Sequence, residues 1–242
     1  MVSGASSGIG QACAIQCAAA GATVILLARN EERLHSTKEM LAGKDNHFMI
    51  SNDLLKNSCP EEELNEIVRK AGKISGFIHA AGVSSTRPLR MVDEKQLTDY
   101  YQVNVVSAIM MTKWISKPAI FHESGCSVVW VASVMGMVGE AAKVSYGLTK
   151  GALIAGSKSL AIELAPKKIR VNTVSPGVVK SPMTENAIYN QTEEGQERIQ
   201  SFHPLGLGTV DDVAHGCRFL LSDEAKWITG TNLVIDGGYT SR

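Results

Sequence analysis

Short apolar runs recur along the chain and alternate with longer stretches in which apolar and polar residues are mixed. The runs are rich in branched side chains and nearly unbroken, which is typical of parallel strands that are covered on both faces. They comprise Val24–Leu27, Gly76–Ala80, Val128–Val131, Ile169–Val174 and Asn232–Ile235. We predict that these five segments are strands.

The stretches between the runs have helical length, for example Leu97–Trp114, Tyr146–Leu164 and Val210–Leu221. Repetition of strand, helix and strand implies right-handed crossovers, so we expect an α/β fold with a mostly parallel sheet and helices on both faces. The 242 residues show no linker, repeat or break in composition, which indicates a single domain. Only Met1–Ser3 precede the first turn, and strands usually have about five or six residues, so we expect a few further residues upstream.

One segment departs from this pattern. Lys180–Gly208 is the longest weakly patterned region, and it contains Pro182, Pro204 and a polar stretch. A long connection late in an α/β domain is either a functional lid or a disordered insert. We expect a substrate lid around 180–208, because the site predicted below needs a cover.

Composition narrows the classes of partner. The chain is 44% hydrophobic, and its 24 basic and 24 acidic residues give a formal net charge of zero. A neutral chain gives no reason to expect a nucleic-acid partner, since duplex binding is dominated by neutralisation of phosphates. No stretch approaches the roughly 20 apolar residues that cross a bilayer, and the first residues lack the features of a secretory signal, so we expect no membrane partner.

The five cysteines are scattered without a C-x-x-C motif, and the six histidines are equally dispersed. This distribution argues against a disulfide framework or a structural zinc site and favours a reducing cytoplasm. Cys13 and Cys17 are four residues apart on a predicted helix, where we expect both to be buried on one face. No second ligand accompanies His79, so we expect a buried, hydrogen-bonded histidine and no metal site.

The segment Gly4-Ala5-Ser6-Ser7-Gly8-Ile9-Gly10 lies between the first apolar residues and a helix that we expect to begin near Gln11. Glycine permits positive φ and lets a pyrophosphate approach the backbone, and a helix N-terminus supplies free N–H groups and partial positive charge. The segment is therefore predicted to bind the phosphates of a dinucleotide. The alternative is an ordinary tight turn, which Gly and Ser also favour.

Arg29 follows the second predicted strand, where a dinucleotide-binding fold places the residue that reads the adenosine ribose. An acidic residue there binds the 2′-hydroxyl of NAD, whereas Arg accommodates the 2′-phosphate of NADP. A guanidinium pairs with phosphate in a bidentate fork, so the sequence favours NADP(H) over NAD(H). The alternative is a surface arginine that pairs with Glu31 or Glu32.

Tyr146 and Lys150 are four residues apart on a predicted helix, which places their side chains on one face. An ammonium within about 4 Å of a phenolate contributes up to roughly 4 kcal/mol at an effective dielectric constant of 20, which is about three pKa units. A phenol tuned in this way can give a proton to a carbonyl oxygen as hydride arrives, or take one in the reverse reaction. Ser133 follows a strand at the carboxyl edge of the predicted sheet, where ligands bind. In isolation the Tyr–Lys pair arises readily by chance, and Ser133 suits a turn or a helix cap.

Taken together, the motifs make the chain resemble the classical short-chain dehydrogenases/reductases over essentially its full length. The matching residues are Gly4-x-x-x-Gly8-Ile9-Gly10, Asp53-Leu54, Ala81-Gly82, Asn104, Ser133, Tyr146-x-x-x-Lys150, Pro176-Gly177 and Asp236-Gly237-Gly238. The resemblance implies a Rossmann-type doubly wound parallel sheet. It also implies an NAD(P)-dependent oxidoreductase that interconverts a ketone and a secondary alcohol. The chain departs from the family at His79-Ala80-Ala81-Gly82, where Asn-Asn-Ala-Gly is common.

The resemblance assigns roles to individual residues. Tyr146 would be the general acid/base, and Lys150 would bind the nicotinamide ribose and lower the pKa of the phenol. Ser133 would orient the substrate, and Asn104 would hold a water in a proton relay through Lys150. Taken alone, Asn104 is equally a helix residue bonded to backbone, and Asp53 a turn former. The residues expected to contact the cofactor are Gly4, Ser6, Ser7, Gly8, Ile9, Gly10, Arg29, Asp53, Leu54, Ala80, Ala81, Gly82, Tyr146, Lys150, Pro176, Gly177, Val179 and Ser181.

The segment His203–Ala214 and the Asp236-Gly237-Gly238 ending are similar to the branch that contains 3-oxoacyl-[acyl-carrier-protein] reductases. This similarity makes a carrier-protein-bound 3-oxoacyl thioester the leading small-molecule substrate, with sugar, polyol and steroid substrates as alternatives. An acidic carrier would need a basic rim near the site. Candidates for that rim are Lys113, Lys117, Lys167 and Lys168.

Members of this family usually form tetramers, so we expect a homotetramer.

Two interpretations without oxidoreductase activity stay open. One is a dinucleotide-binding regulator that keeps the fold without turnover. The other is a methyltransferase, which also begins with a glycine-rich turn between strand and helix. The intact set of Ser133, Tyr146 and Lys150 favours the enzyme over both.

Overall fold

The sheet at the centre of the molecule explains the alternating sequence pattern. The structure, a computed structural model, describes residues 1–185 and 192–241. Within these residues seven parallel strands form one sheet in the order β3-β2-β1-β4-β5-β6-β9. The strands are β1 Val2–Ser3, β2 Ile25–Ala28, β3 Phe48–Ser51, β4 Gly76–His79, β5 Cys126–Val131, β6 Ile169–Pro176 and β9 Asn232–Ile235. The order reverses between β1 and β4, so the expected doubly wound sheet is confirmed.

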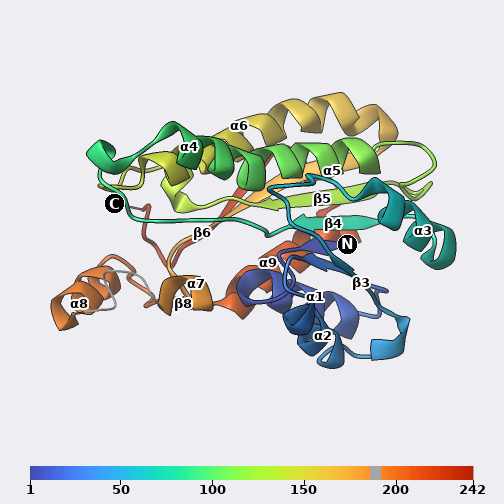
Figure 1. The fold of residues 1–242 in the computed structure, drawn as a ribbon, viewed down its shortest axis with the longest axis horizontal. Helices are drawn as coiled ribbons and strands as arrows, with labels where there is room; N and C mark the ends of the chain where they lie inside the picture. The colour runs from blue at the N-terminus through green and yellow to red at the C-terminus, as the bar shows by residue number, and fades with distance from the viewer. Residues whose placement is uncertain (186–191, 242) are drawn as a thin grey trace.

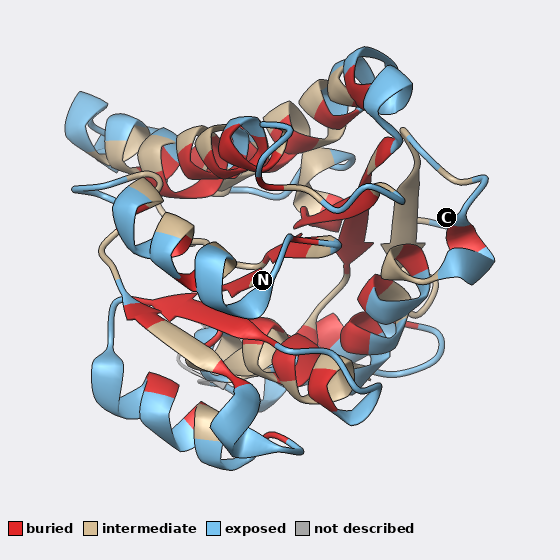
Figure 2. Cartoon of the chain, turned by 90° about the vertical axis from the view of Figure 1, so that its right-hand side faces the viewer, coloured by how far each residue is buried: buried red, intermediate tan, exposed pale blue. Residues whose placement is uncertain are grey.

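Helices cover both faces of this sheet (Figure 1). One layer contains α1 Gly8–Ala19, α2 Glu31–Glu39 and α9 Val210–Leu221. The other contains α3 Glu61–Ala71, α4 Glu94–Tyr101, α5 Ser107–Ile115 and α6 Val144–Leu164. Figure 2 shows the strands as largely buried between the two layers. Because both faces are covered, every residue of β5 is buried, which accounts for its nearly unbroken apolar sequence.

Each helical layer packs on its own hydrophobic cluster. Trp114 and Phe77 lie in one cluster, and Leu26 lies in the other. Cys13 is fully buried in the second cluster, and Cys17 is partly buried against it. The expected shared face is therefore found, although Cys17 is only partly covered.

Most predicted elements lie close to their observed bounds. Val210–Leu221 is α9, and β9 also has its predicted residues. The predicted helix over 97–114 is wrong in one respect, because a π-helical turn at Gln102–Val106 separates α4 from α5. Such turns are rare and often lie at functional sites. Helix α1 begins at Gly8 rather than near Gln11.

The predicted lid region contains more regular structure than its sequence pattern indicated. Strands β7 Val179–Lys180 and β8 Gly208–Thr209 pair in a small second sheet, and α7 Pro182–Glu185 and α8 Glu193–Ser201 lie between them. Ile199 is the only buried residue of α8, so this helix has almost no apolar face to reveal it in the sequence. Residues 186–191 of the predicted lid lie outside the described residues.

The described residues contain neither a membrane-spanning helix nor a cluster of metal ligands. None of the helices there is long and apolar enough to cross a membrane. That part of the chain also contains no group of three or more His, Cys, Asp or Glu residues placed to hold a metal ion.

Candidate active site

The glycine-rich turn follows β1 at the carboxyl edge of the sheet. Gly4 has φ +70°, and a Cβ there would lie 2.7 Å from the Ala81 backbone nitrogen, so the turn packs directly against the loop after β4. A Cβ on Gly10 would overlap the Gly4 carbonyl oxygen. Ser7 precedes α1 without making a side-chain capping bond, which leaves the N–H groups of the first turn uncapped. This geometry fits the pyrophosphate of a dinucleotide.

Arg29 and Asp53 follow the neighbouring strands β2 and β3. Arg29 is exposed, and among the described residues no ion pair joins it to Glu31 or Glu32. Asp53 accepts the Leu55 N–H at 3.1 Å, as a turn former does. Arg29 therefore keeps its guanidinium available at the edge where the adenosine end of a dinucleotide would lie.

Lys150 lies four residues after Tyr146 on α6, as predicted, and the two side chains are close. The Lys150 Nζ atom is 5.5 Å from the centre of the Tyr146 ring. Lys150 is only 4% exposed, and its Nζ donates a hydrogen bond to the Val131 carbonyl oxygen at 2.7 Å. That carbonyl belongs to the last residue of β5, so the contact anchors α6 to the carboxyl edge of the sheet.

Ser133 lies two residues beyond β5 and is buried. Its hydroxyl oxygen accepts the Met135 N–H at 3.2 Å, so it caps a short 3₁₀ helix, which is one of the roles predicted for it in isolation. The same side chain is hydrogen-bonded to the Tyr146 phenol. The structure therefore brings Ser133, Tyr146 and Lys150 together at one edge of the sheet.

The electrostatics of this group differ from the expectation. Burial raises the pKa of the Tyr146 phenol to about 12, although the hydrogen bond with Ser133 opposes that rise. Burial also lowers the pKa of Lys150 to about 8. The predicted lowering of the phenol pKa by Lys150 is not found. The physical reason is that loss of water penalises the phenolate, while the ammonium spends a hydrogen bond on the Val131 carbonyl.

Asn104 lies in the π-helical turn and is completely buried. Its Oδ1 accepts the Val83 N–H at 2.8 Å, and its Nδ2 donates to the Val83 carbonyl at 3.1 Å and to Thr149 Oγ1 at 2.9 Å. The side chain thus joins the loop after β4 to α6 beside Lys150. Sequence reasoning missed Thr149, whose place inside the Tyr-x-x-x-Lys motif was the available signal.

His79, where the chain departs from the family pattern, is the last residue of β4. Its Nδ1 lies 2.8 Å from Ser3 Oγ and its Nε2 lies 3.4 Å from Ser107 Oγ. Burial, helped by the nearby charge of Lys150, lowers the pKa of His79 to about 3. The prediction of a buried, hydrogen-bonded histidine is confirmed, and the ring connects β1, β4 and α5.

The residues expected around a nicotinamide lie where β6 ends and β7 begins. Pro176 ends β6, and Gly177 donates its N–H to the Ile235 carbonyl at 2.9 Å. A pocket of about 760 Å³ opens beside them between α1, β7, α7, α8 and the start of α9. Its lining includes Gly8, Val179 and Ser181 from the predicted set. It also includes Gln11 and Gln200, which sequence reasoning did not identify.

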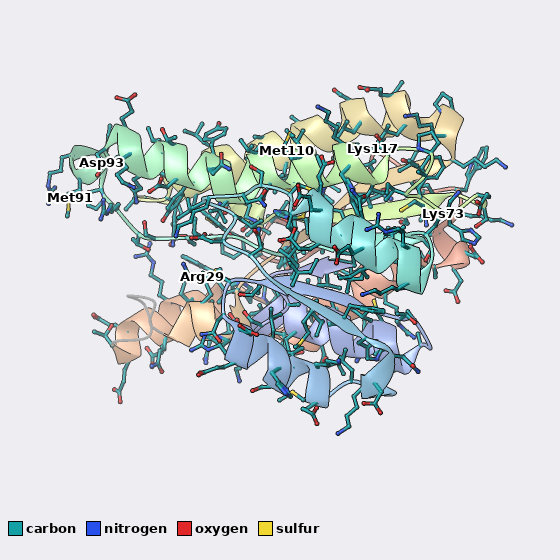
Figure 3. The ribbon with its side chains drawn as sticks, turned by 45° about the vertical axis from the view of Figure 1, so that its right-hand side comes forward. Arg29, Lys73, Met91, Asp93, Met110 and Lys117 are labelled. Atoms are coloured by element: carbon teal, nitrogen blue, oxygen red, sulfur yellow. The ribbon has the colours of Figure 1, made fainter. Side chains whose placement is uncertain are left out.

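The predicted basic rim is wrong. Lys113 lies in the last turn of α5, and Lys117 follows that helix. Lys167 and Lys168 lie between α6 and β6. All four lysines are therefore at the amino edge of the sheet, opposite the site. Figure 3 shows Lys73 and Lys117 toward one end of the molecule and Arg29 toward the other. Lys117 pairs with Glu61. Helices run antiparallel to the strands they cover, so their C-terminal lysines point away from the carboxyl edge.

Comparison with known proteins gives matches along nearly the whole chain. The family described as enoyl-(acyl carrier protein) reductase matches residues 4–240. The chain is 34% identical to 3-oxoacyl-[acyl-carrier-protein] reductase FabG of Rickettsia conorii, over 98% of this chain and 95% of that protein.

Two solved structures are also similar to it. The structure of ElxO with NADP bound has a TM-score of 0.87 at 27% identity, covering 99% of this chain and 97% of that one. A 4-hydroxyisoleucine dehydrogenase complexed with NADH has a TM-score of 0.89 at 29% identity, covering 100% and 98%. The chain belongs to the short-chain dehydrogenase/reductase family and is an NAD(P)-dependent oxidoreductase that acts on CH–OH groups.

Proposed function

We propose that this protein uses NADP(H) to interconvert a 3-oxoacyl thioester and its 3-hydroxy product, with Tyr146 as the proton donor and acceptor. The observation that carries the proposal is the convergence of Ser133, Tyr146 and Lys150 at the carboxyl edge of the sheet. The bound nicotinamide supplies or takes the hydride. The protein supplies the proton and the positions of the reacting groups.

The residues around the edge fit the parts of a dinucleotide. The uncapped start of α1 and the turn before it would hold the pyrophosphate, with Arg29 on the 2′-phosphate. Asp53 and Leu54 would meet the adenine. The residues lining the remainder of the cofactor would be Gly4, Ser6, Ser7, Gly8, Ile9, Gly10, Ala80, Ala81, Gly82, Tyr146, Lys150, Pro176, Gly177, Val179 and Ser181.

The preference for NADP(H) rests on Arg29. Its guanidinium is exposed, and neither Ala28 nor Asn30 beside it is acidic. The relatives support either cofactor, since ElxO was solved with NADP and the 4-hydroxyisoleucine dehydrogenase with NADH. A phosphate-binding arginine is therefore the feature of this chain that separates the two.

The raised pKa of Tyr146 suits reduction of a ketone. With a pKa of about 12 the phenol is protonated at neutral pH and ready to donate to the substrate oxygen, and Ser133 lies beside it to orient the same atom. The Lys150 ammonium, with a pKa of about 8, is mostly protonated at neutral pH and would bind the nicotinamide ribose beside the phenol. The side-chain amide of Asn104 is already hydrogen-bonded to Val83 and Thr149. A proton relay that continues beyond Lys150 would therefore use main-chain groups of the π-helical turn.

The thioester is supported by the similarity to the 3-oxoacyl reductase FabG of Rickettsia conorii. The test offers a panel of carbonyl compounds with NADPH and with NADH. Turnover is measured as the loss of absorbance of the reduced nicotinamide. The panel contains an acetoacetyl thioester, a sugar, a polyol-derived ketone and a steroid ketone. Fastest turnover of the thioester supports the proposal. Cofactor binding without oxidation across the whole panel refutes it.

Two structural expectations belong to the same proposal. The segment 180–208 would act as a substrate lid, because α7 and α8 border the 760 Å³ pocket beside Val179. The chain would form a homotetramer, as members of its family usually do, and subunit contacts would cover exposed apolar residues such as Ile109, Leu148 and Trp227, which expose 43%, 50% and 94% of their surface. Light scattering of the purified protein tests the second expectation, and a monomer would contradict it.

A further inference from the structure

A second polar cluster lies on the loop after β4 and on α4. The Tyr100 hydroxyl donates to Ser85 Oγ at 2.7 Å, and Gln96 Nε2 donates to the same oxygen at 3.0 Å. A hydroxyl oxygen has two lone pairs, so these two donors occupy both of them. The Ser85 O–H group is then free to donate a hydrogen bond. No acceptor for it is found among the residues that the structure describes, 1–185 and 192–241.

The chain places this donor beside the candidate active site. Val83 is bound to Asn104 on one side of Ser85, and Arg87 donates its N–H to the Ala142 carbonyl at 2.8 Å on the other. Ala142 lies in the loop that leads into α6, whose first turn carries Tyr146. The stretch that holds Ser85 therefore runs from the π-helical turn to the start of α6. Tyr100 is also among the groups that raise the pKa of Tyr146, which agrees with this placement.

Two further polar atoms of the same region are unpaired. Helix α4 packs against α6, and Ser145 on α6 is 5% exposed. In the described part of the chain, Ser145 Oγ and Gln96 Oε1 are buried without a hydrogen-bond partner. An unpaired buried polar atom costs about 1–3 kcal/mol, so its retention calls for an explanation. The side chains of Ser85, Gln96, Tyr100 and Ser145 are all uncharged, and the cluster suits a neutral oxygen better than a carboxylate.

We propose that Ser85, held by Tyr100 and Gln96, is a specificity-determining residue that donates a hydrogen bond to a second, neutral oxygen of the substrate. The substrates selected in this way are ketones that carry a further carbonyl or hydroxyl group. A 3-oxoacyl thioester belongs to this class, and a simple alkanone does not. The inference rests on the proposed function, because it concerns the substrate of the same site.

The arrangement is organised before the substrate binds. Both donors to Ser85 come from α4, so they fix the direction of the Ser85 O–H without help from a ligand. A substrate that lacks the second oxygen leaves this donor unpaired, which is the situation in which hydrogen-bonding sites discriminate most strongly. Removal of the hydroxyl should therefore harm only substrates that carry the oxygen.

The test uses pairs of ketones with equal chain length. Ethyl 3-oxobutanoate is paired with 2-heptanone, and 1-hydroxy-2-butanone with 3-pentanone. We expect Ser85→Ala to lower kcat/KM roughly 3- to 10-fold for the oxygenated member of each pair and to leave the alkanone within about twofold. Tyr100→Phe keeps the ring but releases Ser85, and should show a smaller loss of the same selectivity. Ser84→Ala, which removes a hydroxyl one residue earlier, is the matched control and should change neither member.

The outcomes separate the inference from the proposed function. Equal losses on both members of a pair, or no loss in Ser85→Ala and Tyr100→Phe, overturn the inference while the enzyme assignment stands. A wild-type protein that reduces neither the acetoacetyl thioester nor any member of either pair refutes the proposed function, and the inference falls with it. Circular dichroism of each variant shows that the fold is kept, and Tyr100→Phe decides the matter if Ser85→Ala does not fold.

Discussion

The buried histidine at the end of β4 makes the free energy of unfolding depend on pH in a calculable way. His79 has an ordinary pKa of 6.5 in the unfolded chain and about 3 in the fold, because burial disfavours the imidazolium. Between these two values the unfolded chain binds a proton that the folded chain does not. The contribution of the neutral ring is therefore complete above about pH 6.5 and is lost as the pH falls toward 3.

The size of the effect follows from the same two values. Each pKa unit corresponds to about 1.4 kcal/mol, so acidification from pH 7.5 to 5.0 should remove about 2 kcal/mol through His79 alone. His79→Gln keeps a hydrogen-bond donor and acceptor between Ser3 and Ser107 but does not titrate. Its free energy of unfolding should fall by about 2 kcal/mol less than that of the wild type over the same interval.

Urea unfolding at the two pH values measures this difference, and the remaining histidines cancel when the two proteins are compared. His35→Gln is the matched control, because it makes the same replacement at an exposed histidine. If His79→Gln loses as much stability between pH 7.5 and 5.0 as the wild type does, the buried neutral histidine is the wrong account of this position.

Substitutions of Arg29 and Gly10 test the residues proposed to bind the cofactor. Arg29→Asp should shift the ratio of kcat/KM for NADPH over NADH by tenfold or more toward NADH, since it replaces a phosphate partner with a ribose partner; an unchanged ratio removes Arg29 from the phosphate site. Gly10→Ala should destabilise the protein by about 1–3 kcal/mol in urea unfolding, because its Cβ would overlap the Gly4 carbonyl. Gly139→Ala, whose Cβ would meet no atom within 4 Å, is its control, and equal effects would contradict the close packing of the turn.

The sequence predicted the sheet well because both of its faces are covered. A strand such as β5 is then apolar at every position, and the pattern stands out. The glycine-rich turn, Ser133 and the Tyr146–Lys150 pair follow from short-range spacing, which a sequence displays directly. Helix α8 buries only Ile199, so its amphipathic pattern was too weak to predict.

The remaining differences depend on contacts that are distant in sequence. The π-helical turn at Asn104 is held by Val83 and Thr149, and nothing in the local residues marks it. The pKa of Tyr146 is set by burial, which spacing along a helix does not report. The position of Lys117 at the far edge was predictable in principle, because lysines at helix C-termini face away from the carboxyl ends of the strands.

Proton transfer by the Tyr146 phenol is tested most directly by measuring the turnover of Tyr146→Phe together with its affinity for NADPH. General acid–base catalysis contributes about 10²–10⁴-fold, so we predict that ketone reduction falls by at least about 100-fold while the Kd for NADPH changes by less than about threefold. Tyr101→Phe removes an exposed phenol and should behave as the wild type. A Tyr146→Phe enzyme that keeps a tenth or more of the wild-type turnover would contradict the account.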